Sequence, residues 1–155
     1  MRKQKLYSYL LGIIDAEGCF SISIKKQNTA RFGWVIDPVF HVTQHLDARD
    51  VLEDLQKAFN AGRIIPKTGQ ENLLIFIVDN RRQLREKVLP FFQRYPLRIK
   101  KEDFEIFKEV VEALENKEHQ TEDGFRRLVK KARSFTRARK GRYKYTLYEI
   151  LGTEE

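Results

Sequence analysis

Residues 10–18 have the sequence Leu-Leu-Gly-Ile-Ile-Asp-Ala-Glu-Gly, an apolar run that ends in two carboxylates and a glycine. Apolar side chains recur here at helical spacing, which predicts a helix over residues 6–17. Gly18 follows the last helical residue, so we expect it to form a left-handed helix cap. The apolar positions that carry this periodicity are Tyr7, Leu11 and Ile14.

The two acidic residues, Asp15 and Glu17, lie at the end of this predicted helix. The C-terminus of a helix carries partial negative charge, so carboxylates are disfavoured there and Lys or Arg is preferred. A positive group, such as a metal ion, is the natural compensation. The sequence therefore marks the helix end as a candidate functional site.

The nine residues resemble the LAGLIDADG motif of the homing endonuclease family. The differences are conservative: Leu11 replaces Ala, Ile13 replaces Leu, and Glu17 replaces Asp. The resemblance implies an α+β fold with an αββαββα core, an antiparallel β-saddle and extra C-terminal helices. It also implies a homing endonuclease that hydrolyses both strands of a long pseudo-palindromic DNA site and promotes intron mobility.

Length and composition suit one globular domain over residues 1–155. The chain is 41% hydrophobic, has one cysteine (Cys19), and carries a formal net charge of +8. No secretory signal or membrane-spanning run is present in the sequence, so we expect an intracellular protein of a bacterial or archaeal cytoplasm or an organelle, with no membrane partner. The basic charge points to a nucleic-acid partner, and the resemblance implies that this partner is double-stranded DNA.

Periodicity along the chain predicts a helix, two strands, a helix, two strands and a helix, whose strands can form one antiparallel sheet. The resemblance covers about residues 6–115, and a basic helical extension follows over about 120–155. We expect strands near 20–27, 33–44, 63–67 and 73–78. The second expected helix has Asp47 as its N-cap and is ended by Gly62. The later helices are expected from Asp79 or Asn80, as the cap, to Pro90–Pro96, at 98–116, at 125–135 and, behind a Thr146–Glu149 capping box, near 150.

Phosphodiester hydrolysis needs an activated water and stabilisation of the charge that develops on the phosphate, both of which divalent metals can supply. Glu17 is the expected metal ligand and first catalytic residue, and the resemblance adds the carbonyl of Ala16 as a further ligand. It also implies catalytic roles for Gln44, at the end of a strand, and Lys100, near the start of a helix. The expected cofactor is Mg²⁺, with two or three ions shared at a dimeric active site, and Mn²⁺ is expected to substitute. A polar strand end and a solvated basic face are the alternative interpretations of Gln44 and Lys100.

DNA recognition is expected from the outward faces of the strands, because a two-stranded ribbon fits the major groove. The same polar faces are also ordinary for any solvated sheet. The predicted DNA-binding residues are Ser21, Ser23, Lys25, Gln27, Asp37, His41, Arg63 and Lys67.

Only one copy of the motif is present, and single-motif members of the family act as homodimers. Gly12 has no side chain and permits two helices to approach closely, so we expect Leu11, Gly12 and Asp15 at a two-fold interface. Residues 126–144 carry ten Lys and Arg residues, which are suited to phosphate contacts or, alternatively, to a solubilising tail. An RNA-binding maturase acting on its own intron, or a non-catalytic DNA-binding regulator, are the alternative functions.

Overall fold

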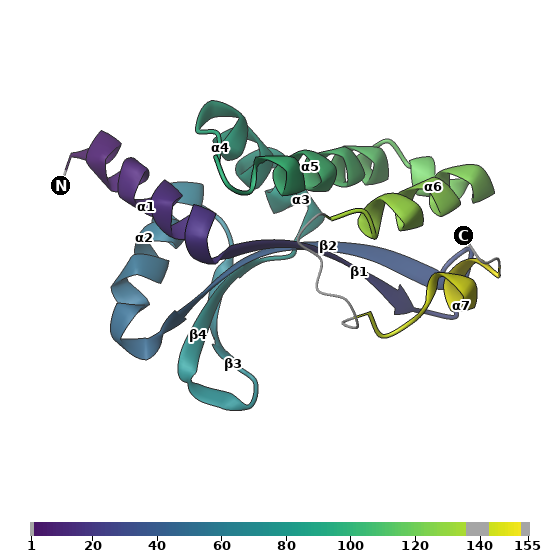
Figure 1. Ribbon diagram of the computed structural model, residues 1–155, viewed down its shortest axis with the longest axis horizontal. Coiled ribbons are helices and arrows are strands. Elements are labelled where there is room, and N and C mark those ends of the chain that lie inside the picture. The colour runs from purple at the N-terminus through teal and green to yellow at the C-terminus, as the bar shows by residue number, and fades with distance from the viewer. Residues whose placement is uncertain (1, 136–142, 153–155) are drawn as a thin grey trace. The chain divides into compact units, whose positions relative to one another are not determined.

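The computed structural model describes residues 2–135 and 143–152 (Figure 1). The four strands form one sheet in the order β1-β2-β4-β3, in which β4 is antiparallel to both β2 and β3. This arrangement confirms the predicted αββαββα order. The elements of the first part of the chain are α1 (Lys3–Glu17), β1 (Gly18–Lys26), β2 (Trp34–His45), α2 (Arg49–Phe59), β3 (Arg63–Lys67) and β4 (Gln70–Val78).

The second part of the described chain is helical. The helical stretch after β4 ends at Arg94, within the predicted range of Pro90 to Pro96, and Pro90 itself lies inside it. A π-helical turn over Leu84–Val88 precedes it, and Pro90 then falls in the first turn of α4, where a missing N–H is tolerated. Among the described residues, no helix combines the length and hydropathy needed to cross a bilayer. The helices are α3 (Arg81–Gln83), α4 (Leu89–Arg94), α5 (Lys101–Glu115), α6 (Glu122–Ala132) and α7 (Leu147–Leu151).

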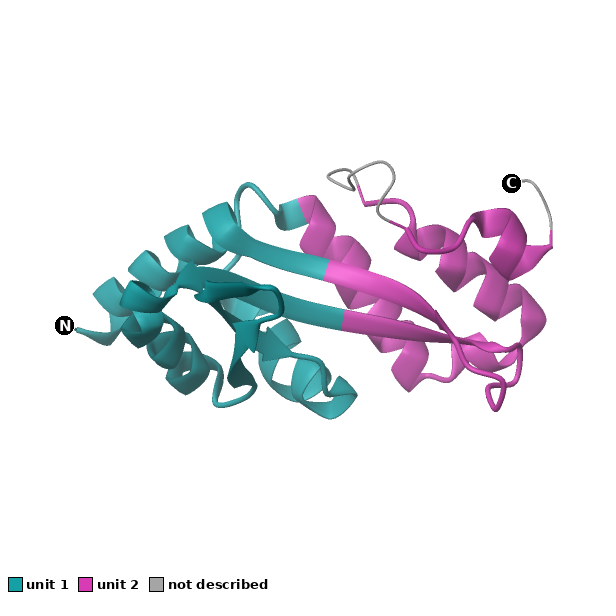
Figure 2. Ribbon diagram, turned by 90° about the horizontal axis from the view of Figure 1, so that it is seen from below, with its two compact units in different colours: residues 1–20, 39–101 teal, residues 21–38, 102–155 magenta. Residues whose placement is uncertain are grey.

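The chain forms two compact units, residues 1–20 with 39–101 and residues 21–38 with 102–155 (Figure 2). The first unit has an aromatic core around Phe40, which is fully buried. Its ring centroid lies 5.2 Å from that of Phe20, 5.5 Å from that of Phe59 and 5.4 Å from that of Phe92. Such aromatic clusters bury large areas and fix the packing of the elements that carry them.

The second unit holds the C-terminal segment by aromatic and polar contacts. The Trp34 and Tyr145 rings meet edge to face at 4.8 Å, and the Arg133 guanidinium lies 3.7 Å from the Tyr143 ring centroid. The predicted capping box of Thr146 and Glu149 is confirmed at the start of α7. Residues 136–142 of the basic segment lie outside the described residues.

The prediction of a left-handed cap at Gly18 is wrong. Gly18 is extended, with φ −72° and ψ 155°, and begins β1 directly. A Cβ atom at this position would lie 2.6 Å from the carbonyl oxygen of Ile14. Glycine is needed because the strand leaves the helix at close range, not because of a positive φ.

The predicted boundaries of the second helix are also wrong. Asp47 is not the N-cap of α2, which begins only at Arg49 with Ala48 as its N-cap. Asp47 lies instead in a preceding 3₁₀ turn, which is capped by the His45 side chain as it accepts a hydrogen bond from the Asp47 N–H. The helix ends at Asn60, whose φ of 50° is left-handed, two residues before Gly62. Asn tolerates this conformation better than most residues, so it replaces the expected glycine signal.

Candidate active site and nucleic-acid interface

The Asp15 carboxylate at the end of α1 binds a backbone segment far away in the sequence. It accepts hydrogen bonds of 3.0 Å from the N–H groups of Arg98, Ile99 and Lys100. These three residues lead from α4 toward α5. Asp15 therefore fixes the backbone from which the Lys100 side chain extends.

Lys100 brings a positive charge to the negative end of α1. Its Nζ donates hydrogen bonds to the carbonyl oxygens of Asp15, at 2.7 Å, and Ala16, at 3.2 Å. Cations at this position are stabilised by the helix dipole and by the unpaired terminal carbonyls. The compensation for which the sequence suggested a metal ion is thus supplied in part by a lysine of the same chain.

These contacts set the ionisation of Asp15. Burial by itself would raise the pKa of this carboxyl. The hydrogen bonds from Ile99, Lys100 and Arg98, together with the charge of Lys100, outweigh that effect and lower the pKa below 3.8. Asp15 is therefore a charged acceptor throughout the neutral range.

Glu17 is the last residue of α1, and its side chain is exposed. Gln44 lies near the end of β2, half-buried and opposite Leu74, on the face of the sheet that carries the buried Val42 and Phe76. Within the described residues, Gln44 makes no hydrogen bond or ion pair with Glu17 or Lys100. Of the four predicted catalytic and metal-binding residues, Lys100 and Ala16 are therefore in direct contact through a hydrogen bond. Glu17 and Gln44 are not hydrogen-bonded to each other in the described part of the chain.

We expect Asp15→Asn to destabilise the protein by about 2 kcal/mol at neutral pH, because hydrogen bonds to a charged group are lost and an amide NH₂ is placed beside N–H donors. Folding lowers the pKa of Asp15, so its carboxylate contributes fully to the free energy of unfolding at pH values above the unfolded pKa of about 3.8. This contribution is lost as the pH falls through the lower pKa of the folded state. The difference in the free energy of unfolding between wild type and Asp15→Asn should therefore be largest near pH 7 and should shrink below pH 4. Urea unfolding at several pH values measures it.

Asp54→Asn is the matched control, since Asp54 makes no hydrogen bond or ion pair in the described part of the chain. The free energy of unfolding of Asp54→Asn should differ little from that of wild type at any pH. All variants are compared at one protein concentration, because self-association makes apparent stability concentration-dependent. A pH-independent loss in Asp15→Asn would contradict the role assigned to the charged carboxylate.

The sheet of the first unit presents an outward face, which we define by the residues of β2, β4 and β3 that alternate with the buried Val42, Leu74, Phe76 and Val78. Strand register places these residues in rows across the three strands. One row is His41, Ile77 and Arg63, and the next is Thr43, Ile75 and Ile65.

The outward face includes residues that the sequence did not assign to it. His41 and Arg63 were predicted, but their neighbours are the half-buried Ile65, Ile75 and Ile77. The sequence from Leu73 to Val78 is apolar throughout, so no polar alternation marks which side chains point outward. Apolar side chains on such a surface can contact thymine methyl groups in the major groove.

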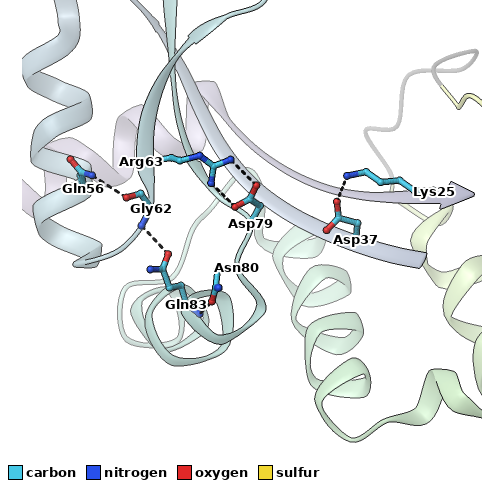
Figure 3. A network of polar contacts seen from close by, with 8 residues as sticks. All are labelled: Lys25, Asp37, Gln56, Gly62, Arg63, Asp79, Asn80 and Gln83. Atoms are coloured by element: carbon cyan, nitrogen blue, oxygen red, sulfur yellow. Dashed lines mark hydrogen bonds and ion pairs between the residues drawn. The ribbon is translucent and has the colours of Figure 1, made fainter. Parts of the chain in front are cut away.

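Two of the predicted DNA-binding cations, Arg63 and Lys25, are held by carboxylates (Figure 3). In the first unit, Arg63 donates from both terminal nitrogens to Asp79, at 2.7 and 3.0 Å. In the second unit, Lys25 pairs with Asp37, so the structure brings two predicted residues together. The hydrogen bond that Arg63 donates to Asp79 is the main cause that raises the pKa of Arg63.

Polar contacts fix the start of β3 beside this site (Figure 3). The Gly62 carbonyl accepts a hydrogen bond from Gln56 at 3.0 Å, and its N–H donates to Gln83 at 3.1 Å. The Gln83 backbone N–H in turn donates to the side chain of Asn80, which is the N-cap of α3. Of the two predicted caps, Asn80 is therefore the cap, and the Asp79 carboxylate accepts hydrogen bonds from Arg63.

The remaining predicted DNA-binding residues lie on both units. Burial, and next the charge of Lys67, lower the pKa of His41, so its imidazole is neutral at pH 7 and can both donate and accept. In the second unit, Ser23 and Gln27 are exposed and Ser21 is half-buried.

The exposed side of α1 is largely apolar. Gly12 and Ala16 are exposed there, together with Tyr9, whose side chain is 48% exposed, and the half-buried Ile13. Of the predicted interface residues, Leu11 and Asp15 are half-buried, and Asp15 is engaged within the chain. Tyr9 and Ile13 are surface residues that the sequence prediction missed, although their spacing to Ala16 is helical.

The donors at the end of α1 fit a hard divalent cation. The exposed Glu17 carboxylate and the Ala16 carbonyl are both oxygen ligands, and Mg²⁺ binds through few protein oxygens together with waters and phosphates. The Ala16 carbonyl already accepts from Lys100, but a carbonyl oxygen has two lone pairs. Among the described residues, no group of three or more His, Cys, Asp or Glu is placed to hold a metal ion.

The profile of the LAGLIDADG endonuclease family matches residues 10–111, which include the C-terminal half of α1, the whole sheet and most of α5. The chain therefore belongs to the LAGLIDADG endonuclease family.

Individual relatives are similar over most of the chain. Homing endonuclease I-ApeII of Aeropyrum pernix is 40% identical over 149 residues, which cover 94% of this chain and 88% of the relative. DNA endonuclease I-CeuI of Chlamydomonas moewusii is 38% identical over 118 residues, or 72% of this chain and 53% of the relative. The solved structure of the archaeal intron-encoded homing endonuclease I-Vdi141I complexed with DNA has a TM-score of 0.88 and 39% identity, covering 98% of this chain and 95% of that one.

Proposed function

We propose that the protein is a homodimeric, magnesium-dependent homing endonuclease that cuts both strands of a long pseudo-palindromic DNA site and promotes the mobility of its intron. The observation that carries the proposal is the exposed Glu17 carboxylate at the end of α1, next to backbone carbonyls bound by Lys100. Relatives with the same fold are DNA endonucleases, which supports the choice of reaction.

The chemistry is assigned to four groups of the chain. Glu17 and the Ala16 carbonyl would hold Mg²⁺, which when bound supplies Lewis acidity at the scissile phosphate. The Lys100 ammonium, a compact and strongly hydrated charge, orders water and steadies the negative phosphate oxygens. Gln44 orders solvent through its amide, which both donates and accepts.

Dimerisation is proposed along the exposed side of α1. A Cβ atom at Gly12 would have no atom from another element of the described chain within 4 Å, so the internal packing of these residues does not require glycine. Glycine inside a helix costs about 1 kcal/mol relative to alanine. Close approach of a second α1 helix accounts for that cost, and the apolar neighbours Tyr9 and Ile13 would be buried in the same contact.

The outward face is proposed to lie in the major groove, where His41, Arg63 and Lys67 meet base edges or phosphates. Ser21, Ser23, Lys25, Gln27 and Asp37 have the same proposed role on the second unit. Basic residues of the 120–155 extension add phosphate contacts that are salt-dependent and independent of sequence.

Selection from a randomised, two-fold-symmetric DNA library tests the function. Purified protein is incubated with the library and Mg²⁺, and cut molecules are recovered and sequenced. We expect one long, nearly palindromic site cut on both strands, and no cutting when Ca²⁺, with its larger coordination shell, replaces Mg²⁺. Failure to cut any DNA under these conditions would overturn the proposal, and RNA binding would then be tested for the maturase alternative.

A further inference from the structure

Arg63 and Asp79 are diagonal neighbours on the outward face. Arg63 of β3 is opposite Ile77 of β4, and Asp79 lies two residues beyond Ile77. Side chains in this relation are within reach of each other across an antiparallel pair. The guanidinium is 54% exposed and the carboxylate 34%, so the pair forms at the surface and not in the core.

The pairing leaves one edge of the guanidinium available. Arginine has five N–H donors, and Asp79 accepts one from each terminal nitrogen, which leaves three. The Nε–H makes no hydrogen bond to the described part of the chain. Together with the remaining N–H of one terminal nitrogen, it forms a second parallel pair of donors along the side edge of the plane.

We propose that Asp79 is a specificity-determining positioning residue, which holds Arg63 so that the side edge of its guanidinium donates to the N7 and O6 acceptors of one guanine. This proposal rests on the proposed function, because it requires the outward face to enter the major groove. Bidentate donation by arginine to guanine is a strong form of direct base recognition.

The carboxylate acts in two ways. It holds a long side chain in one orientation before DNA arrives, so less conformational freedom is lost on binding. It also places a negative charge beside the cation, which opposes a phosphate more than a neutral base edge. Arg63 without Asp79 would be free to bind the phosphate backbone, which carries no base identity.

Asp79→Asn tests the proposal, with Glu86→Gln as the matched control. Glu86 also pairs with arginines, Arg82 and Arg85, and its substitution raises the net charge by the same amount. The site recovered by library selection is first prepared with 7-deazaguanine at each guanine in turn. The guanine contacted by Arg63 is the one whose 7-deaza penalty disappears in Arg63→Ala.

At that base pair, we expect Asp79→Asn to reduce discrimination against the other bases about tenfold, the scale of one bidentate contact. Its binding to non-specific DNA should tighten, and the slope of log affinity against log salt should steepen by about 0.9, the value for one added phosphate contact. Asp79→Glu should retain most of the discrimination. Glu86→Gln should leave discrimination unchanged, and thermal unfolding checks that each variant is folded.

The outcomes separate the two proposals. If wild type selects a site but Asp79→Asn discriminates as well as wild type at the Arg63 position, the role of Asp79 is excluded while the endonuclease function stands. If no guanine depends on Arg63, the inference also fails. If wild type selects no site at all, the proposed function fails first.

Discussion

Glu17→Gln is expected to lose DNA cleavage by about a thousandfold or more while binding the same DNA site. The amide is nearly isosteric with the carboxylate but lacks its charge, so it is a poor ligand for Mg²⁺. Stabilisation of transition-state charge by a metal ion is worth several kcal/mol, and each 1.4 kcal/mol corresponds to a factor of about ten in rate. Single-turnover cleavage of the selected site with Mg²⁺, beside an electrophoretic binding assay with Ca²⁺, measures the two effects.

Glu105→Gln provides the control for the change in charge. Glu105 is exposed on α5, and its substitution changes the net charge by the same amount. It should cut at close to the wild-type rate. A Glu17→Gln protein that retained wild-type cleavage would remove Glu17 from the reaction and leave the end of α1 without its assigned chemistry.

Gly12→Arg is expected to convert the dimer into a folded monomer. The exposed position has room for a side chain within its own subunit, and arginine has a higher helix propensity than glycine, so the fold of each subunit should be kept. A bulky cation between two closely approaching helices, beside its symmetry-related copy, would prevent their contact. Sedimentation equilibrium measures the mass, and circular dichroism monitors the helix content.

Gln93→Arg is the matched control, because it adds the same charge at an exposed position of α4. It should remain dimeric and active. The Gly12→Arg protein should cut neither strand efficiently, since the proposed active site is completed by two subunits. A dimer of wild-type affinity in Gly12→Arg would show that the interface lies elsewhere.

Much of the fold could be predicted from the sequence, because local periodicity is a property of neighbouring residues. The alternation of Ile22 and Ile24 with polar residues predicted β1, and both isoleucines are buried. The Thr146–Glu149 capping box predicted the start of α7. Both signals depend on residues within a few positions of one another.

Other local predictions failed where a competing contact decided the conformation. Gly18 has a glycine's position at a helix end but extended dihedral angles, because the chain enters β1 at once. Asp47 is a good N-cap type, yet it lies inside a 3₁₀ turn that the His45 side chain caps two residues earlier. The residue type limits the backbone conformations and capping roles that a position can adopt. Contacts with neighbouring elements determine which of them is adopted.

The sequence by itself determined that Glu17 ends an apolar helix and that the strands carry basic residues, since both follow from the order of residues in a short window. Only the tertiary structure decided that Asp15 holds the backbone of residues 98–100, that Lys100 binds the end of α1, and that Asp79 orients Arg63. These partners lie 83 to 85 and 16 residues apart in the sequence. Such pairs are set by strand register and by the packing of α1, which bring distant backbone and charge into contact without leaving a periodic signal in the sequence.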